Sequence, residues 1–248
     1  MMLDKVIGVG EVAVSDHRSS QPSFEEFARI AADARVAGML SGKSGIVNVH
    51  LGDSERRLDL IRRVIHDTEI PASQFLPTHV NRNEALFEEC LDFAAEGGTI
   101  DFTGNEDIDY WETICDEVRV CRGIRRLLER GISSDRFTIS SDGQGSMPVF
   151  NAQGEYQGIG IGKASCLLKE VRECVQKESI PLETAIKGIT CNPASILKLD
   201  RKGRIKAGFD ADICLLEEGT LKLNTVIAKG QVMVKDGEQK VFGTFERV

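Results

Sequence analysis

The stretch FLPTHVNRN, residues 75–83, joins a short apolar strand to a run of polar side chains. The polar residues that follow Pro77 are Thr78, His79, Asn81 and Arg82. In parallel β/α folds, binding and catalytic side chains gather just past the carboxyl ends of the strands. A histidine and an arginine three residues apart at such a point therefore indicate a functional loop.

Similar apolar runs recur along the chain and alternate with amphipathic segments. The predicted strands lie at 6–14, 45–51, 74–80, 97–104 and 136–142, and the predicted helices at 23–40, 54–68, 83–98 and 112–131. Ser23 and Glu26 have the spacing of a capping box at the start of the first helix. Regular alternation of strands and helices predicts a parallel sheet with crossover helices, an α/β fold.

Residues after 142 have a different character. The glycine-rich segment 143–163 is expected to form a long loop over the strand ends, and helices are expected near 164–178 and 181–197. The remainder has short alternating strands broken by Gly and Asp. We therefore expect two domains, residues 1–199 with the β/α units and residues 200–248 as part of a small β-domain.

Composition restricts the possible partners and location. The 248 residues carry a formal net charge of −8 with acidic and basic residues interleaved, so nucleic acid and anionic membranes are not expected as partners. No apolar run approaches the ~20 residues of a membrane span, and the amino terminus does not resemble a signal peptide. Seven scattered cysteines without a CxxC pair predict reduced thiols in a cytoplasmic protein and argue against a cysteine zinc site.

Four potential metal ligands stand at or just past predicted strands. They are Glu11, His50, His79 and Asp142. Since all strand ends of a parallel β/α fold face one side, these residues are expected to converge. Imidazole nitrogens and carboxylate oxygens are the ligands of hydrolytic Zn²⁺, which activates a water molecule as nucleophile. Asp142 can combine metal binding with proton transfer to a leaving amine.

Other polar residues close to these strand ends suit an anionic substrate. Arg18 and Arg82 follow Glu11 and His79 by a few residues, and guanidinium groups bind carboxylates bidentately. Ser146, after two loop glycines, can donate a hydrogen bond to a carboxylate. We interpret Arg18, Arg82 and Ser146 as substrate-binding residues.

Several motifs, in order, carry a resemblance to a known family. SDHRS, NVHLGDS, LPTHVNRN, GGTID, SSDGQGS and the closing GRIKAGFDADICLL resemble the isoaspartyl dipeptidase (β-aspartyl peptidase) family of the amidohydrolase superfamily. The resemblance implies a (β/α)8 barrel of the TIM type and zinc-dependent hydrolysis of small isoaspartyl dipeptides, with two zinc ions in the family. By this match His50 and His79 would bind one zinc, and Asp142 would be the remaining ligand and the catalytic base. Arg18, Arg82 and Ser146 would bind the dipeptide.

The sequence departs from the family pattern at two points. Glu11 stands where the family usually has a carboxylated lysine that bridges its metals, so one or two zinc ions are expected here. The HxH pair of the family's first strand has no counterpart among the four histidines of this chain. The chain resembles the carboxyl-terminal portion, about strands 4–8, and is expected to act as a homo-oligomer or with a missing amino-terminal segment.

Two alternatives accompany the dipeptidase hypothesis. The chain could be a different amidohydrolase, such as an acyl-amino-acid deacylase or a cyclic amidase. It could also be a partial barrel without catalytic activity, an interpretation favoured by the missing HxH pair. The two arginines and Ser146 favour the small dipeptide substrate.

Overall fold

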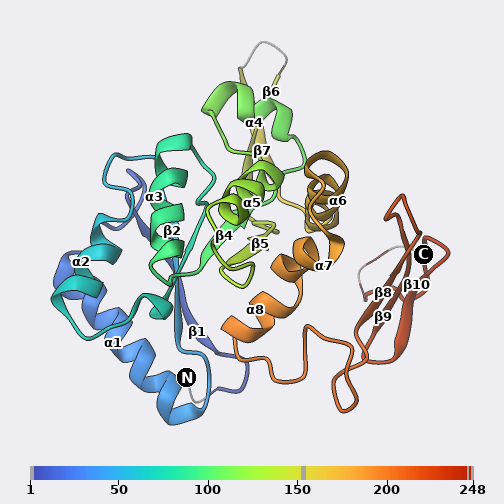
Figure 1. Cartoon of the computed structure of the whole chain (residues 1–248), viewed down its shortest axis with the longest axis horizontal. Coiled ribbons are helices and arrows are strands. Elements are labelled where there is room, and N and C mark those ends of the chain that lie inside the picture. Colours follow the sequence, from blue (N-terminus) through green and yellow to red (C-terminus); the bar gives the residue numbers. More distant parts are fainter. Residues whose placement is uncertain (1–2, 152–154, 245, 247–248) are drawn as a thin grey trace. The chain divides into compact units, whose positions relative to one another are not determined.

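The computed structural model describes residues 3–151, 155–244 and 246, and divides the chain into two compact units. The first unit comprises Met1–Lys198 and the second comprises Leu199–Val248. Figure 1 shows the elements of each unit along the chain. Within the described part of the chain, no helix is long and apolar enough to cross a membrane.

The first unit is built on a sheet of five parallel strands in sequential order. The strands are β1 (Gly8–Val14), β2 (Ile46–Leu51), β3 (Phe75–Thr78), β4 (Ile100–Thr103) and β5 (Phe137–Ser140). Because neighbouring strands run parallel, each connection must cross back over the sheet, and helices supply these crossovers. The predicted α/β fold class is confirmed.

Helices follow each of the first four strands (Figure 1). They are α1 (Phe24–Ser41), α2 (Asp59–Asp67), α3 (Glu84–Ala95), α4 (Ile108–Cys115) and α5 (Val120–Glu129), with a 3₁₀ turn η1 (Ala72–Gln74) before β3. The predicted capping box is confirmed, since Ser23 caps the backbone of Glu26 and the Glu26 carboxylate accepts from the Ser23 N–H. Reciprocal capping of this kind fixes where the helix begins.

Side chains alternate between the two faces of the sheet. In β2, Val47 and Val49 are buried in the apolar core, whereas Asn48 lies on the opposite face and lines a cavity. In β4, Phe102 packs between aromatic rings, with its centroid 5.7 Å from that of Phe87 and 6.4 Å from that of Phe137. This two-residue period puts one apolar face against the helices and leaves a polar face free to form a site.

The predicted helix over 112–131 is wrong in one respect, because the structure contains two helices in this region. Asp116 has a φ of 56°, in the left-handed region, and ends α4 before α5 begins at Val120. An aspartate tolerates this conformation better than most residues, so the chain turns here without glycine or proline. The break brings the backbone N–H of Val118 to the carbonyl of Asn81, at 2.8 Å.

The predicted long loop over 143–163 is also corrected. Strands β6 (Ser146–Phe150) and β7 (Tyr156–Ile161) form an antiparallel pair, with Ser146 opposite Ile161 and Val149 opposite Gly158. The glycines that suggested a loop alternate with isoleucines along β7, which is the period of a strand.

The end of the first unit is helical, as expected, but the second predicted helix is divided into three shorter segments. Helix α6 (Cys166–Glu178) is followed by α7 (Leu182–Ala185), the 3₁₀ segment η2 (Ile186–Ile189) and α8 (Cys191–Ile196). The second unit contains an antiparallel sheet in the order β11-β10-β9-β8. Its strands are β8 (Ile213–Leu216), β9 (Leu223–Ala228), β10 (Gln231–Lys235) and β11 (Glu238–Gln239).

Candidate metal and substrate site

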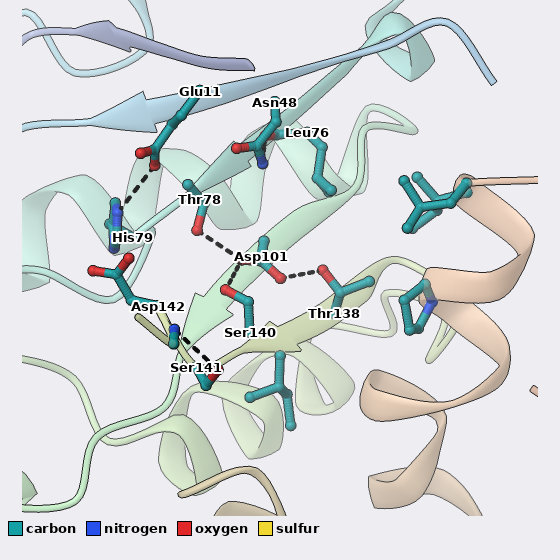
Figure 2. Close-up of a pocket in the computed structure, with 15 residues that line it drawn as sticks. Glu11, Asn48, Leu76, Thr78, His79, Asp101, Thr138, Ser140, Ser141 and Asp142 are labelled. Atoms are coloured by element: carbon teal, nitrogen blue, oxygen red, sulfur yellow. Dashed lines mark hydrogen bonds and ion pairs between the residues drawn. The ribbon is translucent and has the colours of Figure 1, made fainter. Parts of the chain in front are cut away.

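Three predicted ligands from three neighbouring strands meet at one end of the sheet. Glu11 lies in β1, His50 in β2 and His79 directly after β3. The Oε1 atom of Glu11 is 3.2 Å from Nδ1 of His50 and 3.3 Å from Nε2 of His79. Figure 2 shows the Glu11 and His79 side chains pointing toward one another. The two imidazole rings lie 4.4 Å apart between centroids.

The local backbone explains how Glu11 and His79 are presented. The register of β1 against β2 shifts between Val9 and Val12, and Glu11 lies within this irregularity. Gly10 precedes it with a φ of 149°, and a Cβ atom there would lie 2.8 Å from the Cβ of Asn48, so only glycine fits. His79 itself has a φ of 62°, a conformation in which non-glycine residues concentrate at functional sites.

Each histidine is also held on its other ring nitrogen. Asp16 Oδ2 lies 3.1 Å from Nε2 of His50, and Thr103 Oγ1 lies 2.7 Å from Nδ1 of His79. Asp16 and His79 are both buried. Partners of this kind fix the tautomer and orientation of metal-binding histidines, so they leave Nδ1 of His50 and Nε2 of His79 directed at Glu11.

The charge state of Glu11 suits a ligand. Hydrogen bonds with His50, then His79, lower the pKa of the Glu11 carboxyl to about 2, against the opposing effect of burial. Its carboxylate is therefore ionised at neutral pH.

The donor set fits a divalent cation such as zinc. The ligand atoms of Glu11, His50 and His79 all lie within 4.8 Å of one another, and two imidazoles with one carboxylate are a common zinc set. Among the residues that the structure describes, this group does not include Asp142. Asp142 follows β5 with a φ of 47° and, in Figure 2, its carboxylate lies beside His79.

Two cavities meet at His79 and Asp142. One, of about 360 Å³, extends along the polar face of the sheet past Asn48 and Asp101. The other, of about 220 Å³, is lined by all three predicted substrate-binding residues, Arg18, Arg82 and Ser146, besides His79 and Asp142. Three of the four predicted metal ligands and the three predicted substrate-binding residues therefore line two cavities that share His79 and Asp142. The fourth ligand, His50, belongs to the cluster with Glu11 and His79.

The two arginines are held differently. Arg18 forms a bidentate pair with Asp16, with Nε 3.0 Å from Oδ1 and the terminal nitrogen 2.8 Å from Oδ2, and this pairing raises the pKa of Arg18. The same hydrogen bonds keep the pKa of Asp16 well below its usual range. Within the described residues, the buried Nε atom of Arg82 has no hydrogen-bond partner. An unsatisfied buried donor beside a cavity is a group that a ligand oxygen can satisfy.

Sequence reasoning missed four residues around this site. Asp16 and Thr103 orient the histidines, and Asn81 and Glu117 support the smaller cavity. Asp16 was detectable in principle, because it lies in the same SDHRS motif as Arg18. The others depend on contacts between residues 22 to 36 positions apart, for which the local pattern gives no signal.

Below the site, a buried carboxyl organises the polar face of the sheet. Asp101 of β4 accepts hydrogen bonds from the hydroxyls of Thr78, at 2.6 Å, and of Ser140, at 2.5 Å, as well as from Thr138 (Figure 2). Burial raises the pKa of Asp101, although these hydroxyls oppose the shift. The network ties β3, β4 and β5 together directly beneath His79 and Asp142.

A cluster of potential metal ligands at the strand ends of a parallel β/α sheet is typical of metal-dependent hydrolases with barrel folds. The model of the amidohydrolase family matches residues 48–239, and the chain belongs to this family. It is similar to the β-aspartyl dipeptidase of Fervidobacterium islandicum AW-1, solved in complex with a β-Asp-Leu dipeptide. The two share 43% identity with a TM-score of 0.86, over 99% of this chain and 62% of that chain.

More distant relatives agree on the fold. A deacetylase of Agrobacterium fabrum is 22% identical over 82% of this chain and 48% of its own length. The atrazine chlorohydrolase TrzN of Arthrobacter aurescens, solved with zinc, has a TM-score of 0.52 at 14% identity, over 93% of this chain and 51% of that chain. This chain thus spans about half the length of the deacetylase and 62% of the β-aspartyl dipeptidase.

Proposed function

We propose that this chain carries most of the active site of a zinc-dependent hydrolase that cleaves β-aspartyl (isoaspartyl) dipeptides. The observation that carries the proposal is the cavity in which Arg18, Arg82 and Ser146 face Asp142 and the metal-ligand cluster. The 43% identity with a β-aspartyl dipeptidase supports the choice of substrate.

Glu11, His50 and His79 are proposed to hold one zinc ion, with Asp142 completing its ligands. When bound, zinc supplies a Lewis acid that polarises the amide carbonyl and makes water a nucleophile near neutral pH. Glu11 is proposed to reach a second zinc as well, since a carboxylate has two oxygens and can bridge. Further ligands for that second ion would come from another copy of the chain or from a complementing amino-terminal segment.

Arg82, Arg18 and Ser146 are proposed to bind the carboxylates of the dipeptide. The buried Nε of Arg82 gains a hydrogen-bond partner in this way, and a guanidinium holds a carboxylate in a fixed direction. Asp142 is proposed to accept the proton of the attacking water and to deliver it to the departing amine. A carboxylate close to the reacting amide can serve as general base and then as general acid.

The proposal is tested by adding zinc to the purified chain and following release of leucine from β-Asp-Leu. The assay is run on the chain alone and on the chain joined to the amino-terminal segment of the Fervidobacterium enzyme. Hydrolysis of β-Asp-Leu but not of α-Asp-Leu by either preparation, with loss of activity after chelation, is expected. Absence of hydrolysis by both, with zinc bound, would refute the proposed activity.

A second candidate is the removal of acyl groups from amino acids, favoured by the 22% identity to a deacetylase. Both activities hydrolyse an amide, but a deacetylase substrate lacks the α-ammonium and α-carboxylate of the aspartyl group. A preference for N-acetyl-leucine over β-Asp-Leu in the same assay would support this candidate instead.

A further inference from the structure

A third cavity, of about 420 Å³, adjoins the smaller of the two cavities at the site. It lies between α4 and the β6–β7 hairpin, which Figure 1 shows beside one another, and we call it the hairpin cavity. Asn105 and Trp111 line both the hairpin cavity and the smaller cavity, so the two share a wall. Of its described lining residues, none is a proposed metal ligand.

The hairpin cavity is lined largely by rings, aliphatic groups and glycines. The rings belong to Tyr110 and Trp111, whose centroids lie 5.3 Å apart in an edge-to-face arrangement. From the hairpin, Val149 and Gly160 share one face, because Val149 is paired with Gly158 and strand residues two apart lie on the same side. Gly160 contributes no side chain, which leaves room in the cavity.

The charged groups of the hairpin cavity are largely matched within it. The Lys163 ammonium lies 3.7 Å from the Glu106 carboxylate, which also accepts from the Ser165 hydroxyl at 2.6 Å. Asp107 is exposed at the start of α4. A charged ligand group would have to compete with the Lys163–Glu106 pair, whereas an apolar group gains free energy by leaving water. The cavity therefore favours an apolar ligand group.

Helix α4 is fastened to the segment that follows it. The buried Arg119 donates from Nε to Glu112 at 2.7 Å and also forms an ion pair with Asp109, and both acids belong to α4. Tyr110 and Trp111 lie between these two acids along the helix. Two contacts from one planar guanidinium hold this turn in place, so Trp111 is presented to the two cavities as a fixed wall.

One part of the proposed substrate has no binding group so far. In β-aspartyl dipeptides the aspartyl part is constant, and the side chain of the released residue is the part that varies. The α-carbon of that residue carries the nitrogen of the scissile amide, which must lie at the metal cluster, and a carboxylate, which is proposed to bind in the smaller cavity. Its side chain is directed away from both groups. The wall of Asn105 and Trp111 leads from the smaller cavity to the hairpin cavity.

Building on the proposed function, we infer that the hairpin cavity binds the side chain of the residue that hydrolysis releases, with Trp111 as its main contact, and that it favours large apolar side chains. Burial of such a side chain stabilises the bound substrate in proportion to the apolar area removed from water. An aromatic side chain also packs well against the Trp111 ring. A released glycine makes none of these contacts.

The inference predicts a preference among three substrates that differ only in the released side chain, β-Asp-Gly, β-Asp-Leu and β-Asp-Phe. On the active zinc-loaded preparation, we expect kcat/KM to rise by about 10-fold or more from β-Asp-Gly to β-Asp-Leu. A fully buried methylene group is worth about fourfold, and an open cavity buries only part of the leucine side chain. The value for β-Asp-Phe should be at least as high as that for β-Asp-Leu.

Two changes should act on this preference in different ways. Trp111→Ala removes the wall and should reduce the preference for β-Asp-Leu over β-Asp-Gly to about threefold or less, whereas Trp111→Phe should keep most of it. Gly160→Leu adds a side chain on the face that carries Val149, so kcat/KM should fall by about 10-fold for β-Asp-Phe and stay nearly unchanged for β-Asp-Gly. Ile159→Ala, an exposed change on the opposite face of β7, is the control and should leave all three values unchanged.

The outcomes separate this inference from the proposed function. Hydrolysis of all three dipeptides with equal kcat/KM overturns the inference and leaves the dipeptidase proposal standing. A preference that is unchanged in folded Trp111→Ala and Gly160→Leu also overturns it, because the released side chain would then bind elsewhere. If the wild type hydrolyses none of the three, the proposed function fails and this inference falls with it. Should Trp111→Ala not fold, the comparison of β-Asp-Phe with β-Asp-Gly in Gly160→Leu decides.

Discussion

Asp16 Oδ2 lies 3.1 Å from His50 Nε2, and the opposite ring nitrogen of His50 faces Glu11. Asp16 thus holds one side of the His50 ring and directs the other side toward the carboxylate of Glu11. The same Asp16 carboxylate binds Arg18, so the position of a proposed metal ligand and that of a proposed substrate ligand depend on one side chain.

The first prediction concerns this shared carboxylate. Asp16→Asn should weaken zinc binding by about 10- to 100-fold, because the neutral amide polarises and orients His50 less well. The dissociation constant is measured by competition with a chromophoric chelator. Asp33→Asn on the exposed face of α1 is the control and should leave it unchanged. If Asp16→Asn and the wild type bind zinc with equal affinity, His50 does not need the Asp16 carboxylate to bind the ion.

The second prediction links zinc to folding. A ligand that binds only the folded state at a concentration 100 times its dissociation constant adds about 2.7 kcal/mol to the free energy of unfolding. Urea unfolding with and without zinc should show this increase in the wild type. It should disappear in His79→Ala, which removes one of the three clustered ligands. His66→Ala, an exposed histidine on α2, should respond to zinc as the wild type does.

These predictions combine residues found from the sequence with residues found only in the structure. Glu11, His50, His79 and Asp142 could be found because apolar runs locate the strands and a parallel sheet aligns their ends. The Ser23–Glu26 box could be found because its contacts span one helical turn. Thr103 and Glu117 could not, since their roles depend on where β4 and the segment before α5 pack against the loop after β3.

Two errors in the predicted elements have different physical origins. The break between α4 and α5 lies at Asp116 in the left-handed conformation, and the chain beyond it is held by the hydrogen bond from Val118 N–H to the distant Asn81 carbonyl. The β6–β7 hairpin is local, but its glycines are residues that strands usually lack, so the sequence pattern of the segment predicts a loop.

The third prediction separates binding from chemistry at Arg82. Its pairing with a substrate carboxylate exists in both the ground state and the transition state, so Arg82→Ala should mainly raise KM, by about 10- to 100-fold. Steady-state kinetics with β-Asp-Leu on the active zinc-loaded preparation supply the measurement. Arg29→Ala, on the exposed face of α1, serves as the control. A large fall in kcat at constant KM would contradict the assignment.

The fourth prediction addresses proton transfer by Asp142. Asn has the same size and can still coordinate through its oxygen, but its amide is too weakly basic to accept a proton. Asp142→Asn should therefore keep zinc and fold while kcat falls by about 10²- to 10⁴-fold. Asp135→Asn, an exposed residue in the turn before β5, should keep normal turnover. Near-normal kcat in Asp142→Asn would rule out the proposed base.

The last prediction uses the buried carboxyl of Glu170 in α6, which is 1% exposed and accepts from the Asn105 N–H at 3.1 Å. Burial raises the pKa of this carboxyl from 4.5 to about 7. The folded state therefore holds the proton more tightly than the unfolded state. The contribution to stability is complete below about pH 4.5 and is lost as the pH rises to about 7.

Glu170→Gln keeps an acceptor for the Asn105 N–H but has no titrating group. The variant should therefore not lose stability at this site as the pH rises. At pH 8 we expect the variant to exceed the wild type by about 2–3 kcal/mol in the free energy of unfolding, whereas near pH 4.5 the two should be nearly equal. Urea unfolding at both pH values gives the comparison, with Glu129→Gln on the exposed side of α5 as the control. A difference between Glu170→Gln and wild type that stays constant from pH 4.5 to pH 8 would mean that Glu170 does not titrate in this range. Its burial would then be compensated by the Asn105 N–H and by the Lys169 ammonium, both of which act to lower its pKa.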